Sequence, residues 1–296
     1  MYTTVSRNLV ARTVRPFPDL PQYRGDHRFD LFLPPSYLFG HTLGDGEFAT
    51  VRLAYNLRTE TYVAIKCFKP RSGQYMMLDE QIMRELMATK GLTHQHIVRT
   101  YEAILYGNRI FMVMEYCPYG DLRKYINKTG ALAEVAARRF FGQLCLGVQK
   151  MHNLDLVHRD LKLENILIDA NFKLKIGDLG CARRQMDKQL HTVTGSYAYG
   201  APELVRGDHY NGKKADMWSL GIILYAMVVG KLPYTDKGRL KKMLKDRMKI
   251  PEFPLTLSVQ CCQILSGLLS YDPHNRLSLD EIIRHPWMEV GVETEL

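Results

Sequence analysis

The stretch VHRDLKLENILI brings an acid, a base and an amide together within a few residues of the chain. Its polar side chains include Asp160, Lys162 and Asn165. The apolar pairs on either side, Leu156-Val157 and Ile166-Leu167, predict short strands that hold the loop between them at fixed positions. A carboxylate fixed in this way can orient an incoming hydroxyl group or accept its proton. Asp160 is therefore a candidate catalytic group.

A second acid follows in the stretch LKIGDLG, where Leu174 and Ile176 should anchor Asp178. Magnesium prefers hard oxygen ligands, takes few of them from the protein, and completes its shell with water and substrate phosphates. Asp178 and Asn165 together offer such oxygens. The sequence thus predicts a magnesium site beside Asp160.

Two features upstream would suit a ligand that carries phosphates. The stretch LGDGEFATV lies between two predicted strands and presents Gly44 and Gly46, with Phe48 at the tip. Glycine lets backbone amides approach phosphate oxygens closely, although a glycine-rich hairpin can equally be an ordinary turn. The stretch VAIK ends an apolar strand with Lys66, which could hold phosphate charge. Glu85, on a predicted helix, is either its partner or an exposed helix carboxylate.

The elements that position these residues divide the chain in two. Runs of β-branched and aromatic residues predict five strands, with a helix over about 75–90 between the third and the fourth. The predicted strands cover residues 37–43, 49–56, 61–68, 96–105 and 109–116.

The second half of the sequence is mostly helical. Phe141, Leu144, Val148 and Met151 recur at helical spacing and predict a long helix that ends at His152-Asn153. The stretch DMWSLGIILYAMVVG is apolar on nearly every face, which predicts a helix in the protein interior. A small sheet lobe followed by a larger helical lobe, with a cleft between them, is the expected architecture.

Taken in order, these motifs resemble the signature of the protein kinase family: G-x-G-x-F-A-x-V, V-A-I-K, a helix glutamate, H-R-D-L-K-x-E-N, D-L-G and A-P-E. The resemblance implies an α+β, bilobal protein kinase fold, in which a small antiparallel-sheet N-lobe with one main helix precedes a larger, mainly helical C-lobe. The implied boundaries are a partly disordered N-terminal extension (1–36), a kinase domain (37–288) with N-lobe 37–114, hinge 115–120 and C-lobe 121–288, and a short tail (289–296).

The resemblance also implies ATP and Mg²⁺ as cofactors and assigns a role to each matching residue. The nucleotide would contact Leu43, Gly44, Gly46, Phe48, Val51, Ala64, Lys66, Met114, Glu115, Cys117 and Asp121. The catalytic set would be Asp160, Lys162, Lys66 and Glu85, with Asn165 and Asp178 as the magnesium ligands.

The loop residues resemble the serine/threonine type of kinase. Lys162 follows the catalytic Asp160 by two positions, and Ser196 occupies the matching place near the acceptor pocket. The implied partners are proteins with Ser or Thr acceptors. Asp121 and Glu164 either favour a basic residue N-terminal to the acceptor or are ordinary surface acids.

Thr192 stands where the family carries an activation-loop phosphosite, and its modification implies an upstream activating kinase as a further partner. A phosphate group on Thr192, with a charge near −2, could pair with Arg159 and Arg183 and order the loop. Two scaffolding contacts are implied as well: an ion pair between Glu203 and Arg276, and bonds from Asp216 to the backbone of the catalytic loop. Leu179 and Ala49 depart from the usual Phe and Gly of the family.

Several stretches, among them KKADMWSLGIILYAMVVGKLPY and GSYAYGAPE, are similar to the calmodulin-dependent-kinase group. Within that group, the stretch LKKMLKDRMKIPEFPLTLSVQCCQIL is most similar to the testis-specific serine kinases, which implies a role in spermatogenesis. The alternative reading is a pseudokinase-like scaffold or allosteric partner. The presence of Lys66, Glu85, Asp160, Asn165 and Asp178 together argues against it.

Composition favours a soluble, intracellular protein. The net charge is +9, and much of it lies in residues 236–249, which predict an amphipathic surface helix. The chain lacks aromatic stacking platforms for nucleic acid, so a nucleic-acid partner is not expected. Its longest apolar run is far shorter than the roughly 20 residues that span a bilayer, so a membrane partner is not expected either. The cysteines form no C-x-x-C pair, and the N-terminus carries no secretion signal. We expect a cytoplasmic location.

Overall fold

The computed structural model of the protein describes residues 33–69, 80–106, 109–184, 197–206, 210–234 and 252–289. Predictions for residues 1–32, Thr192, Ser196, the basic stretch 236–249 and residues 290–296 fall outside this description. Within the described ranges, no helix is both long enough and apolar enough to cross a membrane.

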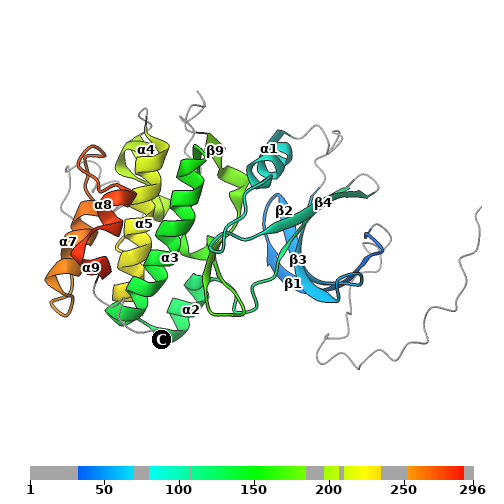
Figure 1. The fold of residues 1–296 in the computed structure, drawn as a ribbon, viewed down its shortest axis with the longest axis horizontal. Coiled ribbons are helices and arrows are strands. Elements are labelled where there is room, and N and C mark those ends of the chain that lie inside the picture. Colours follow the sequence, from blue (N-terminus) through cyan, green and yellow to red (C-terminus); the bar gives the residue numbers. More distant parts are fainter. Residues whose placement is uncertain are drawn as a thin grey trace, which may run out of the picture.

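The N-terminal part is a five-stranded antiparallel sheet in the order β1-β2-β3-β5-β4 (Figure 1). The strands are β1 (Tyr37–Asp45), β2 (Ala49–Asn56), β3 (Thr61–Phe68), β4 (Thr100–Tyr106) and β5 (Arg109–Glu115). Alternate residues of β5 face opposite sides, because successive side chains of a strand point in opposite directions. Phe111 and Val113 pack with Ile65 on one face, while Ile110 and Met112 pack with Ile82 of helix α1 on the other.

Helix α1 (Glu80–Thr89) is the main helix of this lobe, and it lies within the predicted range 75–90, of which residues 75–79 are outside the description. The fourth strand begins later than its apolar pattern indicates. Residues 96–98 leave the sheet because Ile97 forms a parallel bridge with Ile176, and Val98 N donates to Ile176 O at 2.8 Å. The predicted strand 96–105 is therefore too long at its start.

The second part of the chain is mainly helical, and Figure 1 shows its helices gathered on the opposite side of the molecule from the sheet. They are α2 (Leu122–Thr129), α3 (Glu134–Asn153), α4 (Pro202–Arg206), α5 (Gly212–Val229), α7 (Val259–Leu268), α8 (Leu279–Ile283) and α9 (Pro286–Glu289). Helix α3 ends where the sequence predicts, and Phe141, Leu144, Val148 and Met151 are fully buried.

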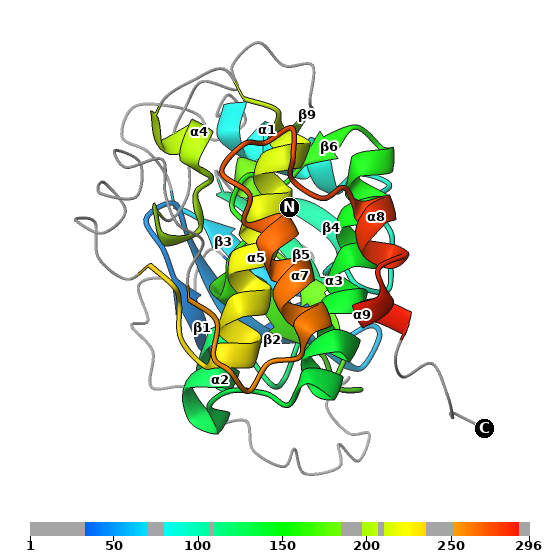
Figure 2. The ribbon, with the colours of Figure 1, turned by 90° about the vertical axis from the view of Figure 1, so that its left-hand side faces the viewer.

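The apolar helix α5 lies between α3 and α7 in Figure 1 and contacts both, and Figure 2 shows it running lengthwise beside α7. Helix α5 meets the end of α7 at Gly221, where an added Cβ would lie 2.8 Å from Leu269 Cδ2 and 2.9 Å from Leu268 Cβ. Real Cβ atoms do not come that close, so glycine is required there for the helices to touch. The α+β, two-lobed architecture expected from the sequence is confirmed.

Four short strands carry the loops that hold the candidate catalytic residues. Strand β6 (Leu156–Val157) pairs with β9 (Arg183–Arg184), and β7 (Ile166–Ile168) pairs with β8 (Leu174–Ile176). The inward side chains of β6, β7 and β8 are fully buried: Val157, Ile166, Ile168, Leu174 and Ile176. The loop between β6 and β7 is thus fixed at both ends.

Candidate active site

A cavity of about 750 Å³ lies between the sheet and the helical lobe. Residues of β1, β2, β3 and β5 form one side, and residues of the loops after β6 and β8 form the other. All the residues predicted to contact a nucleotide line it: Leu43, Gly44, Gly46, Phe48, Val51, Ala64, Lys66, Met114, Glu115, Cys117 and Asp121. Glu85, Asp160, Asn165 and Asp178 line the same cavity.

The two lobes are joined across this cavity by the side chain of Lys66. Its Nζ lies 2.5 Å from Glu85 Oε1 on helix α1 and 2.9 Å from Asp178 Oδ1. Burial disfavours the charged ammonium, but the two carboxylates outweigh burial and raise the pKa of Lys66. Burial would also raise the pKa of Asp178, yet the neighbouring ammonium group of Lys66 lowers it. Lys66 and Asp178 are therefore held in their charged forms.

Asp178 adopts a left-handed backbone conformation, with φ of +53°, directly before the short 3₁₀ turn η4 (Leu179–Cys181). Such a conformation is uncommon for a residue with a Cβ and persists where the surroundings hold it. Leu179 is buried at 5% exposure, and turn η4 packs against helix α1. A Cβ on Gly180 would lie 3.3 Å from both Asp178 Oδ1 and Glu85 Oε2, so this glycine fits between the two carboxylates.

The catalytic loop bonds to itself around Asp160. Lys162 Nζ donates to Asp160 Oδ2 at 2.7 Å, and Asn165 Nδ2 donates to the same oxygen at 3.1 Å and to Asp160 O at 2.9 Å. Lys162 is not among the residues that line the cavity, but it is bonded to Asp160, which does line it. The two donors fix the direction of the carboxylate, as a group that orients a hydroxyl requires.

Asn165 and Asp178 fit the demands of a magnesium ion. Because the amide nitrogen of Asn165 is bonded to Asp160, its amide oxygen serves as an acceptor, and the Asp178 side chain is 49% exposed beside it in the same cavity wall. Two oxygen ligands suffice for magnesium when phosphates and water supply the rest. In the part of the chain that the structure describes, no group of three or more His, Cys, Asp or Glu side chains could hold a metal alone.

Below the loop, the buried Asp216 of helix α5 holds the backbone in place. Its carboxylate accepts hydrogen bonds from His158 N and Arg159 N, each at 2.9 Å, and lies 2.9 Å from His152 Nε2. Burial opposes its charge, but these bonds lower the pKa of Asp216. The predicted contact with the catalytic loop is present. The bond from Arg159 N to Asp216 also holds the left-handed backbone of Arg159, whose φ is +69°.

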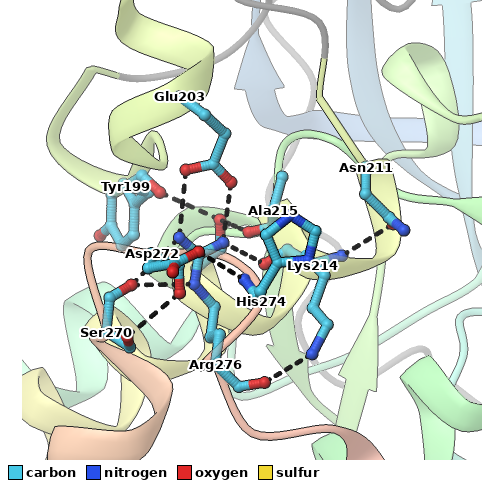
Figure 3. Close-up of polar contacts among 10 residues, drawn as sticks. Tyr199, Glu203, Asn211, Lys214, Ala215, Ser270, Asp272, His274 and Arg276 are labelled. Carbon is cyan, nitrogen blue, oxygen red and sulfur yellow. Dashed lines mark hydrogen bonds and ion pairs between the residues drawn. The ribbon is translucent and has the colours of Figure 1, made fainter.

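The second predicted scaffold contact is present as well (Figure 3). Arg276 Nη1 lies 2.8 Å from Glu203 Oε1, and Nη2 lies 3.1 Å from Oε2, so the pair is bidentate. The guanidinium also donates to Lys214 O and Ser270 O, and the two charged residues are only 1% and 3% exposed. Through these contacts the pair holds α4, which follows the segment 185–196 in the chain, against α5 and the residues after α7.

The glycine-rich turn between β1 and β2 is closed by a hydrogen bond from Gly46 N to Ala49 O at 2.9 Å. Lys69 Nζ donates to Gly46 O at 2.7 Å and lies 3.0 Å from Asp45 Oδ1. A Cβ on Gly44 would meet no atom within 4 Å. Packing inside the protein therefore does not require glycine at this position.

The sequence did not indicate several residues that line the cavity. Leu167 lies on strand β7 between the fully buried Ile166 and Ile168, and it points to the opposite side. The alternation of the short strand could have identified it. Val98 lines the cavity because residues 96–98 leave the sheet. Cys181, the last residue of η4, is also in the wall and had no signal in the sequence.

The hinge carries one further contact that spacing did not reveal. Lys175 Nζ of β8 lies 2.7 Å from Glu115 Oε1, and both side chains are mostly buried. Glu115 N also donates to Arg99 O at 2.8 Å. The carboxylate and the backbone amide of Glu115 are thus already bonded to other residues of the protein.

Comparison with known proteins gives the same picture. The sequence model described as "Protein kinase domain" matches residues 37–288. Maternal embryonic leucine zipper kinase of Xenopus tropicalis is 41% identical over 262 residues, which cover 86% of this chain and 39% of that protein. Serine/threonine protein kinase OSK3 of Oryza sativa subsp. japonica is 38% identical over 256 residues, which cover 86% of this chain and 50% of that protein. The chain thus spans half or less of the length of these relatives.

Proposed function

The chain belongs to the protein kinase domain family, and from that premise we propose that it transfers the γ-phosphoryl group of ATP to serine or threonine hydroxyls of proteins. The observation that carries this proposal is the double contact of Lys66 with Glu85 and Asp178, at 2.5 and 2.9 Å, inside a cavity of about 750 Å³. A lysine held between two acids at the wall of a cavity is placed to meet phosphate charge.

Each side of the cavity has its own task in this proposal. On the sheet side, the turn with Gly44 and Gly46 would cover the phosphates. On the helical side, Asn165 and Asp178 would hold Mg²⁺. The ion, when bound, neutralises phosphate charge. Transfer then depends on positioning and on charge compensation, because little covalent chemistry is required of the protein.

Asp160 would orient the acceptor hydroxyl and take its proton. Its Oδ2 is fixed by Lys162 and Asn165, so the direction of the carboxylate is set before a substrate arrives. Lys162, beside it, would support the transferring phosphoryl group. The serine/threonine assignment draws on Lys162 and on relatives named as serine/threonine protein kinases.

A peptide array tests activity and acceptor together. The chain is incubated with labelled ATP and Mg²⁺ on peptides that differ only in Ser, Thr or Tyr at the acceptor. We expect label on Ser and Thr peptides and none with Asp160→Asn. Label on Tyr peptides alone would overturn the acceptor assignment, and no label above the Asp160→Asn background would favour a scaffold.

Regulation by phosphorylation of Thr192 belongs to the same proposal. Arg183 pairs with Val157, two residues before Arg159, across strands β6 and β9, and both arginines act on Tyr210: burial raises the pKa of Tyr210, while both guanidinium groups act to lower it. Arg159 Nε also donates to Tyr210 OH at 3.0 Å. Two arginines in one place suit a phosphate group, which accepts charge-assisted hydrogen bonds from both.

The subfamily and the location in the cell are proposed from the resemblance of the sequence. We infer membership of the calmodulin-dependent-kinase group, with the testis-specific serine kinases as the nearest subfamily and a cytoplasmic location. The sequence identity of 38–41% to the relatives above supports a serine/threonine kinase in general and does not select this subfamily.

A further inference from the structure

The rim of the cavity beside Asp160 carries a second acid, Glu164, whose charge is already matched from within the chain. Glu164 belongs to the 3₁₀ turn η3 (Leu163–Asn165) and lines the same cavity as Asp160. Arg123 Nη1, near the start of helix α2, donates to Glu164 Oε1. On the other oxygen, Tyr199 OH of the turn η5 (Tyr197–Tyr199) donates to Oε2 at 3.2 Å. Both carboxylate oxygens are thus occupied, one of them by a cation.

Asp121, which lines the same cavity, has a similar arrangement. Its Oδ1 accepts from Lys124 N at 2.8 Å and so caps helix α2, and its Oδ2 lies 3.0 Å from Lys124 Nζ. The two acids and the two bases Arg123 and Lys124 sum to zero charge. A basic side chain of a substrate would therefore meet Asp121 and Glu164 already paired with cations of the chain.

The exposure of the groups decides how firmly the pair is held. The side chains of Arg123 and Glu164 are 52% and 30% exposed, so solvent weakens their attraction. A substrate cation could displace Arg123, but only by breaking this contact, which offsets most of the gain from the new one. Without Arg123, the substrate cation would gain its contact with Glu164 at no such cost.

On the basis of the proposed kinase function, we propose that Arg123 is a specificity-determining residue. It occupies Glu164 and so suppresses selection for a basic side chain N-terminal to the acceptor. The chain accordingly takes Ser or Thr substrates whose side chain at this subsite is uncharged. The sequence left two interpretations of Glu164 open, a site for a basic substrate residue or an ordinary surface acid. Neither interpretation includes the contact with Arg123.

The test compares kcat/KM for matched peptides that differ by one arginine, placed two or three positions before the acceptor. For the wild type, the ratio of the arginine peptide to the neutral peptide should stay below about threefold. Arg123→Ala should raise this ratio about tenfold, which corresponds to about 1.4 kcal/mol. Arg123→Lys keeps the cation and should keep the ratio low. Lys128→Ala, which removes the same charge from the last turn of α2, should leave the ratio unchanged.

The double variant Arg123→Ala/Glu164→Gln separates a charge effect from a structural one. If Glu164 is the group that Arg123 masks, the raised ratio should fall back to the wild-type value. An unchanged ratio in Arg123→Ala, or a raised ratio that survives in the double variant, would overturn the proposal on Arg123. Phosphorylation of the neutral peptide by the wild type upholds the kinase activity in either case, whereas absence of transfer from every variant would overturn that activity and this proposal together.

Discussion

Lys66 Nζ, on the sheet lobe, lies 2.9 Å from Asp178 Oδ1, which follows it by 112 residues and belongs to the helical lobe. This contact crosses the cavity, so it requires the two lobes to approach each other closely. Because Glu85 Oε1 also lies 2.5 Å from the same ammonium, helix α1 is drawn to the cavity as well. Lys66 thus connects strand β3, helix α1 and the loop that carries Asp178, which are far apart in the sequence.

Replacing Lys66 should remove activity more strongly than replacing its helix partner. Lys66→Met deletes the charge that faces the phosphates, and we expect a fall in phosphotransfer of at least about 100-fold. Glu85→Gln keeps the lysine and its contact with Asp178, so a fall of only about tenfold is expected. Steady-state rates at saturating ATP measure both. Equal losses in the two variants would contradict a direct role for the ammonium group.

Loss of the buried pair between Arg276 and Glu203 should act through stability. Arg276→Ala leaves a buried carboxylate without its partner, and the free energy of unfolding should fall by about 3–5 kcal/mol. Lys213→Ala is the matched control, because its pair with Asp155 is largely exposed and should contribute about 0–1 kcal/mol. Urea unfolding of the three proteins provides the comparison. A similar, small change in both variants would contradict the structural role given to Arg276.

The hinge thiol Cys117 should resist alkylation. Burial, followed by the charge of Glu115, raises its pKa to about 12, and the residue is 7% exposed. Since only the thiolate reacts, its reaction with iodoacetamide at pH 8 should be at least about 100-fold slower than in the unfolded chain. The rate should still rise above pH 9, where a free thiol levels off. Peptide mass spectrometry follows the site, and a plateau near pH 9 would contradict the assignment.

The same thiol links stability to pH. Its pKa is higher in the folded chain than in the unfolded chain, where it is near 8.5. The stability that Cys117 contributes is therefore complete below about pH 8.5 and is lost progressively as the pH rises toward the folded value. Cys117→Ser should make the free energy of unfolding less dependent on pH in this alkaline range.

Phosphorylation at Thr192 should activate the chain. Treatment with an activating kinase should raise the turnover of the wild type and leave Thr192→Ala at its basal rate, because only the wild type gains a phosphate that Arg159 and Arg183 can bind. Intact-protein mass spectrometry confirms the single modification. The idea would fail if the treated variant reached the same turnover as the treated wild type.

Much of the site was predictable because it depends on short motifs. Lys66 ends an apolar strand, and Asp160, Asn165 and Asp178 stand on loops between short buried strands, so local pattern alone places them near fixed elements. Their meeting in one cavity follows from the order of those elements.

The remainder depends on contacts between distant segments. Arg123 and Glu164 are 41 residues apart, and nothing in their spacing indicates that the guanidinium of Arg123 bonds to the carboxylate of Glu164. Val98 was expected in a sheet strand, but its amide bonds to Ile176 of the other lobe. Such pairings are decided by tertiary packing, which overrides the local apolar pattern.

The most direct test of the account measures transfer and nucleotide binding on the same two proteins. Wild type and Asp160→Asn are each mixed with labelled ATP, Mg²⁺ and a serine peptide, and binding of ATP is measured in parallel. We predict that Asp160→Asn binds ATP with unchanged affinity while its transfer rate falls by at least about 100-fold. Equal transfer rates for the two proteins, or failure of the wild type to bind ATP, would contradict the account.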